Sequence, residues 1–135
     1  MKKKCIYTLL IFYTFLGIVQ SQAQERKVTI IKPLNGDTVG APVEVCIKVE
    51  GLELEPAKMG VNEGKGHHHI LFSSLPKDLS KPLGKQEVIH MGSGVACHTL
   101  NLAPGTHSLL ALFAYGNHVP YNPPISDKIL ISVHE

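Results

Sequence analysis

The fold is organised around residues 64–72, which read GKGHHHILF. Two glycines open this stretch, three consecutive histidines follow, and an apolar run closes it. A short apolar run bounded by turn residues is typical of a buried strand. Histidine is neutral near pH 7 and is the commonest metal ligand in proteins. We therefore expect a buried strand whose first residues lie at the rim of a binding site.

Short segments with strand-like patterns lie on both sides of this stretch. In residues 42–50 one phase holds only Val and Ile, and the other holds Glu, Cys and Lys, which predicts a half-buried strand. Residues 106–115 are apolar in both phases, which predicts a central strand of a sheet. Together, the predicted strands are 27–31, 42–50, 67–73, 87–91, 96–102, 106–115 and 126–133.

About seven short strands, separated by turns rich in Gly and Pro, predict an all-β fold. We expect an immunoglobulin-like antiparallel β-sandwich, with a small barrel as the alternative. The chain contains no Trp, so it lacks the tryptophan of true immunoglobulin domains. The topology is therefore a hypothesis that rests on strand number and spacing.

Residues 1–23 have the pattern of a cleaved signal peptide. Three lysines at positions 2–4 precede the apolar residues 7–19, which are too short to span a membrane, and Ser21-Gln22-Ala23 ends the segment with small residues. We expect cleavage after Ala23, which leaves residues 24–135 as one periplasmic or secreted domain with no membrane span. A retained anchor is the alternative.

The charge balance and the missing motifs exclude several functions. Of 13 Lys and Arg residues, three lie in the signal peptide, which leaves 10 against 11 Asp and Glu. Such a domain has no basic face for nucleic acid or anionic lipid. The sequence also lacks a nucleophile elbow, paired carboxylates and a phosphate-binding loop before a helix. We therefore expect a non-catalytic domain; a metal hydrolase or oxidase with Glu63 as base is a weaker alternative.

The predicted topology brings histidines from distant segments to one end of the sandwich. His67 and His69 project to the same face of their strand, so they form a chelating pair for copper or zinc. We expect His118 to be the third ligand, with His68 and His90 as further candidates. His68 lies in the other phase, so the alternative for it is a buried structural histidine that is hydrogen-bonded to the backbone.

The expected function is metal binding, with a periplasmic protein as a further partner. The alternative is a structural or interaction domain, in which the histidines make hydrogen bonds and the rim binds protein or glycan. His107 begins a strand at the opposite end, about 26–30 Å away, so we do not expect it to reach the site.

Cys46 and Cys97 are the cysteines of the mature chain, because Cys5 leaves with the signal peptide. Both lie in the solvent phase of strands that are sheet neighbours in the predicted topology. An oxidising compartment favours a cross-strand disulfide between them. The rival is that Cys97, beside His98, is a soft ligand for copper.

Three motifs resemble an uncharacterised bacterial exported domain family, a domain of unknown function. They are GKGHHHIL at 64–71, PGTHSL at 104–109 and NHVP at 117–120. The resemblance covers about residues 33–133 and implies export and a compact β fold, but no activity. The histidines of these motifs are His67, His68, His69, His107 and His118, and the resemblance singles them out. For His107 it implies either a cap on the Pro-Gly turn or a strand that is shorter than predicted.

Overall fold

The computed structural model describes residues 24–85 and 88–135, so the predicted signal peptide lies outside the described residues. The strands are β1 (Lys27–Lys32), β2 (Thr38–Gly40), β3 (Val43–Glu50), β4 (Glu53–Leu54), β5 (Lys65–Leu71), β6 (Val88–His90), β7 (Cys97–Leu100), β8 (Gly105–Ala114) and β9 (Ser126–His134). Within the described ranges, no helix has the length and hydrophobicity that a membrane span requires.

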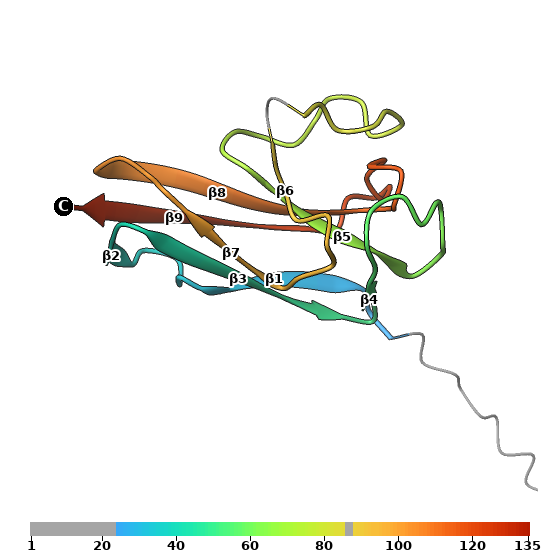
Figure 1. Ribbon diagram of the computed structural model, residues 1–135, viewed down its shortest axis with the longest axis horizontal. Helices are drawn as coiled ribbons and strands as arrows, with labels where there is room; N and C mark the ends of the chain where they lie inside the picture. Colours follow the sequence, from blue (N-terminus) through green and yellow to red (C-terminus); the bar gives the residue numbers. More distant parts are fainter. Residues whose placement is uncertain (1–23, 86–87) are drawn as a thin grey trace, which may run out of the picture.

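The strands form two sheets that face each other. One sheet has the order β1-β3-β7, and the other has the order β2-β9-β8-β5-β4, with β6 paired to β5. Figure 1 shows the two layers, with β5, β8 and β9 above β1 and β3. Apart from β2 with β9 and β4 with β5, all strand pairs are antiparallel. The predicted all-β sandwich is therefore confirmed.

The main core lies between the sheets, and a smaller one lies on the outer face of the six-stranded sheet. The main core contains inward side chains of both sheets, such as Val45, Ile70 and Phe113. The outer cluster contains Leu71 and Leu110, among others, covered by side chains of the 72–85 segment and of β6. From Leu109 to Ala114, β8 is buried on both faces, because the main core covers one face and the outer cluster covers the other, as the apolar pattern of this segment predicts.

The structure corrects several predicted boundaries. β5 begins at Lys65, two residues before the prediction, and ends at Leu71. Phe72, predicted to be in the core, is 42% exposed because the chain has already left the sheet. β2 and β4 were not predicted, since strands of three and two residues are too short to show a period.

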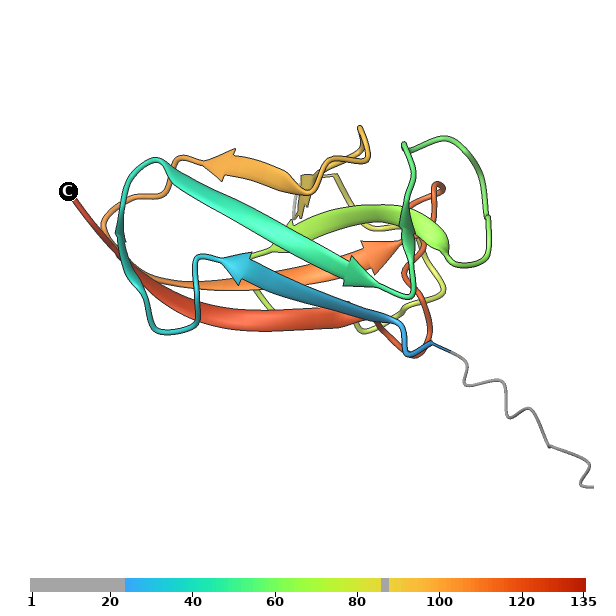
Figure 2. The ribbon, with the colours of Figure 1, turned by 90° about the horizontal axis from the view of Figure 1, so that it is seen from below.

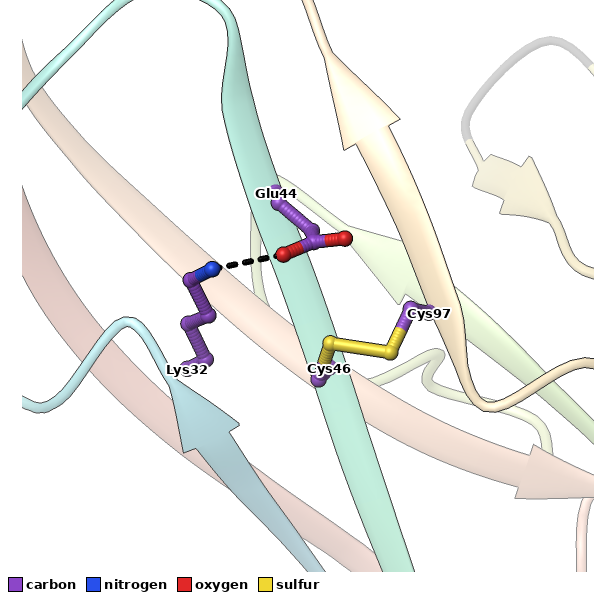
Figure 3. The surroundings of a disulfide bond; sticks show 4 residues. All are labelled: Lys32, Glu44, Cys46 and Cys97. Carbon is purple, nitrogen blue, oxygen red and sulfur yellow. Dashed lines mark hydrogen bonds and ion pairs between the residues drawn. A yellow bond between two sulfur atoms is a disulfide. The ribbon is translucent and has the colours of Figure 1, made fainter.

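Cys46 and Cys97 form a disulfide across the β3–β7 pair, with Cα atoms 4.1 Å apart. Figure 3 shows this bond near the ion pair of Lys32 and Glu44, in which Nζ and Oε2 are 2.6 Å apart. The neighbours Val45 and Ile47 point into the core, so the disulfide lies on the outer face of the three-stranded sheet. Cys97 therefore offers no thiolate to a metal.

Long loops gather near one end of the sandwich. In Figures 1 and 2 the 51–64 and 115–125 loops lie at the same end as β4, away from the C-terminus. The 72–85 loop lies above β5 and β8, on the side away from β1 and β3 (Figure 1). Backbone hydrogen bonds fix these loops to one another and to the sheet, such as Glu55 N to Gly66 O at 2.7 Å and Leu83 N to His118 O at 2.9 Å.

Candidate metal centre

Four histidines converge on the outer face of the six-stranded sheet. His67 and His69 come from β5, His90 from β6, and His118 from the β8–β9 loop. One ring nitrogen of each lies within 4.8 Å of those of the other three, and we call this group the histidine cluster. Spacing of two residues on a strand explains why the two β5 side chains share a face. His90 joins them because it is paired with His69 across the β5–β6 ladder.

The spacing of three Nε2 atoms fits a shared ion better than hydrogen bonds. The His90 Nε2 atom lies 3.1 Å from His67 Nε2 and 3.0 Å from His118 Nε2. An imidazole nitrogen carries either a proton or a lone pair, so His90 Nε2 cannot donate to one neighbour and accept from the other. Nitrogens bound to one ion at about 2.0–2.1 Å lie about 2.8–3.4 Å apart, for angles between a right angle and a tetrahedral one.

The two β5 histidines of the cluster are fully buried, and their environment keeps them neutral. Burial, reinforced by the neighbouring imidazoles, lowers the pKa of His67 to about 4 and that of His69 to about 3. Desolvation also lowers the pKa of His90, with smaller effects of His118 and Lys85. Neutral imidazoles at pH 7 present the lone pairs that metal binding requires.

Ring nitrogens without hydrogen-bond partners also support a metal site. Among the described residues, neither ring nitrogen of His69 has a hydrogen-bond partner. A buried polar atom without a partner costs about 1–3 kcal/mol. An ion bound by one of these nitrogens would remove part of that cost. In the described part of the chain, the cluster contains only imidazoles, a ligand type that suits zinc and copper.

The NHVP motif holds His118 in a tight turn. His118 has φ +68°, a left-handed conformation that costs a residue with a Cβ about 1–2 kcal/mol. The His118 N–H donates to Tyr115 O at 2.8 Å, and Asn117 Oδ1 accepts from Val119 N at 3.1 Å. Strained conformations of this kind are concentrated at functional sites. The turn therefore aims the His118 ring at the histidine cluster.

Two of the glycines that close packing requires, Gly66 and Gly92, lie beside residues of the histidine cluster. A Cβ on Gly66 would lie 2.1 Å from the Ala114 carbonyl oxygen, so this glycine allows β5 to pack against β8. A Cβ on Gly92 would lie 2.0 Å from Cε1 of His90. Gly92 therefore leaves room for the His90 ring in the position that it has in the cluster.

The remaining predicted site residues lie elsewhere. The His68 side chain faces the main core, where its ring centroid is 5.4 Å from that of Phe113, and it is not part of the histidine cluster. Its predicted backbone hydrogen bond is also absent, since within residues 24–85 and 88–135 neither ring nitrogen has a partner. His107 Nε2 instead contacts Ala103 O at 2.7 Å, so this histidine caps the Pro-Gly turn.

Glu63 does not face the histidine cluster as a base. Its carboxylate pairs with Arg26 and accepts a hydrogen bond from the Tyr115 hydroxyl at 3.0 Å. The Arg26 hydrogen bond, followed by that of Tyr115, lowers the pKa of Glu63. A carboxylate held in this way is a weak proton acceptor, so the structure provides no support for the hydrolase or oxidase alternative.

The comparisons with known proteins give one match. A family model described as a domain of unknown function, DUF4399, matches residues 45–134. This range includes the histidine cluster and both disulfide cysteines. No curated protein and no solved structure matches the chain.

Proposed function

Because the chain belongs to the DUF4399 family, a domain of unknown function, we propose its function from the site itself. The protein is an exported, non-catalytic domain that binds one copper or zinc ion through the histidine cluster. The observation that carries this proposal is the convergence of four ring nitrogens within 4.8 Å of one another. The pattern of residues 1–23 and the disulfide, which suits an oxidising compartment, support export to the periplasm or the cell exterior.

Four protein ligands favour binding over catalysis. Catalytic zinc sites usually have three protein ligands and leave a fourth position for water or substrate, whereas closed sites have four. In the described part of the chain, no carboxylate joins the histidine cluster as a general base. Metal handling therefore fits the site better than hydrolysis.

The alternative of a purely structural histidine group is less well supported. In that case the buried ring nitrogens of the cluster would have hydrogen-bond partners. Within the described ranges, the ring nitrogens of His69 have none. The ring nitrogens of His68, outside the cluster, also lack partners, so the support for a metal lies in the convergence of the His69 ring with three other imidazoles, which His68 does not share.

Titration of the metal-free protein with Cu(II) and Zn(II) tests the proposal. We expect one ion per chain, measured by isothermal titration calorimetry and elemental analysis. The double variant His67→Ala/His69→Ala should lose the site, whereas His107→Ala/His134→Ala, which removes the same number of imidazoles, should keep it. Circular dichroism checks that both variants fold. Equal affinity of wild type and the His67→Ala/His69→Ala variant would reject the proposal.

The metal and the compartment need separate measurements. Elemental analysis of the protein purified from its own cells identifies the ion that is bound there. Fractionation of the same cells, combined with the mass of the mature N-terminus, tests export and cleavage after Ala23. We expect the mature protein in the periplasm or the medium, carrying copper or zinc.

A further inference from the structure

A cavity of about 500 Å³ lies beside the histidine cluster. Its wall includes the rings of His69, His90 and His118, and most of its remaining surface is apolar. The volume falls within the range of small-molecule sites, about 300–1,000 Å³. An ion in the histidine cluster would therefore be close to a space large enough for a small organic molecule.

The cavity walls are fixed to the same backbone that carries the ligands. Lys58 N donates to Gly116 O at 3.0 Å, and Ala57 N donates to Gly92 O at 2.8 Å. On the other side, Leu83 N donates to the carbonyl oxygen of His118 itself. The cavity is thus formed by the fold before any ligand is present, which lowers the entropic cost of binding.

The charges around the cavity favour an anion. Four neutral imidazoles leave the two positive charges of a bound ion without compensation. His67 and His69 are buried, so water reaches the ion from one side only, and a counter-charge there is favourable. Among residues 24–85 and 88–135, no carboxylate belongs to the histidine cluster. The cavity wall instead carries two further cationic side chains, Lys58 and Lys85. Neither ammonium group forms an ion pair with another described residue.

We infer that this cavity binds a small organic carboxylate with an apolar body, next to the metal ion. The carboxylate lies between the ion and the two lysines, where it compensates the positive charge. The apolar body packs against Leu83 and Val88, which line the cavity. The inference rests on the proposed metal function, because the ion supplies the largest positive charge. The domain then holds an ion and an organic anion together.

Benzoate is a suitable probe, and benzamide is its uncharged analogue of similar shape. The first step is to load the protein with Cu(II) or Zn(II) and to measure the number of bound ions. Calorimetric titration with each probe then follows, on loaded and on metal-free protein. We expect benzoate to bind the loaded protein at least ten-fold more tightly than the metal-free protein, and at least ten-fold more tightly than benzamide.

A lysine variant tests the role of the cavity wall. The double variant Lys58→Gln/Lys85→Gln should bind benzoate at least ten-fold more weakly and still bind one ion per chain. The control is Lys128→Gln, on the exposed part of β9, which should bind benzoate like wild type.

The outcomes separate this inference from the proposed function. If one ion binds but benzoate affinity is absent, or is the same with and without the ion, the anion site is rejected and the metal site stands. If benzoate affinity needs the ion but not the lysines, the assigned position of the carboxylate is wrong. If no ion binds, the metal proposal fails, and the anion inference fails with it.

Discussion

His69 of β5 lies directly opposite His90 of β6 in the antiparallel ladder, and their stacked rings have centroids 5.3 Å apart. This pair joins a ligand from the middle of the sheet to one on a strand of only three residues. A shift of the β6 register by one residue would turn the His90 side chain to the other face. The histidine cluster therefore depends on the register of one short strand.

His67 and His68 are chain neighbours on opposite faces of β5, so leucine at each position gives a matched test. His67→Leu should abolish binding of the ion, because it removes a ligand. His68→Leu should keep one ion per chain and raise the free energy of unfolding by about 1 kcal/mol, because it replaces a buried imidazole without partners among the described residues. Metal titration and urea unfolding measure both effects. Loss of the ion in His68→Leu would contradict the assignment of faces.

Gly92→Ala should weaken metal binding with little effect on the fold. The added methyl group would overlap the His90 ring, which is the movable end of a side chain and can turn away. We expect a ten- to hundred-fold lower affinity for the ion, about 1.4 kcal/mol for each factor of ten. Gly84→Ala is the control, since a Cβ there meets nothing within 4 Å. Unchanged affinity in Gly92→Ala would show that the His90 ring is not a ligand in this position.

The left-handed conformation of His118 predicts a difference between two variants that both lack the ring. His118→Ala and His118→Gly should each lose the ion. His118→Gly should be more stable than His118→Ala by about 1 kcal/mol, because glycine adopts positive φ without a steric cost. Thermal unfolding of the metal-free variants measures the difference. The opposite order of stability would mean that the turn changes its conformation in the variants.

Much of the fold could be predicted because the longer strands have a clear period. Polar and apolar residues alternate in β3 and β9, and β8 is apolar from Leu109 onward, so their positions follow from side-chain burial alone. β2 has three residues and β4 has two, and each pairs in parallel with a longer strand. They are recognised as strands only by this pairing. Such contacts are not visible in a single sequence.

The site could be predicted only in part, for a reason that lies in β5. His67 and His69 share a face by their spacing, and His118 was expected to join them, as the structure shows. The histidines were expected at one end of the sandwich, and their position on the outer face of the six-stranded sheet was not predicted. From Gly66 to Leu71 every residue of β5 is buried, because the loops cover its outer face. Alternation separated His68 from His67 and His69, but it could not decide whether His68 was a ligand or a core residue, because both faces of this strand are buried.

Removal of the disulfide should lower stability and leave the metal site intact. The cysteines are 51 residues apart in sequence, a loop for which the chain-entropy model gives about 4 kcal/mol. We expect Cys46→Ala/Cys97→Ala to unfold at lower urea concentration by about this free energy and still bind one ion per chain. The ligands come from the other sheet and its loops, so the two features should be independent. A lost ion in a variant that is still folded would show that they are coupled.

The metal-free protein should lose stability as the pH falls below 6.5. The pKa of His68 is about 4 in the folded state, and that of His69 is about 3, against 6.5 as the ordinary value. At a pH below 6.5 and above the folded-state pKa values, the unfolded chain binds more protons than the folded chain. The free energy of unfolding therefore falls with falling pH. The slope is about 1.4 kcal/mol per pH unit for each such histidine.

Urea unfolding between pH 7.5 and 5 in the presence of a chelator measures this slope. His68→Leu should reduce it by the contribution of one histidine. Well above pH 6.5 these histidines are neutral in both states and contribute no slope. An equal slope in wild type and His68→Leu would contradict the lowered pKa of His68.

The four ligands come from separate parts of the chain, with His90 23 residues after His67 and His118 28 residues after His90. A bound ion would therefore cross-link three segments of the six-stranded sheet and its loops, as the disulfide cross-links two strands of the other sheet. The disulfide is covalent and needs an oxidant to form, whereas the proposed metal cross-link would exist only while the ion is supplied. With the ion bound as proposed, each layer of the sandwich would depend on a different property of its surroundings, one on oxidising conditions and the other on the availability of a metal.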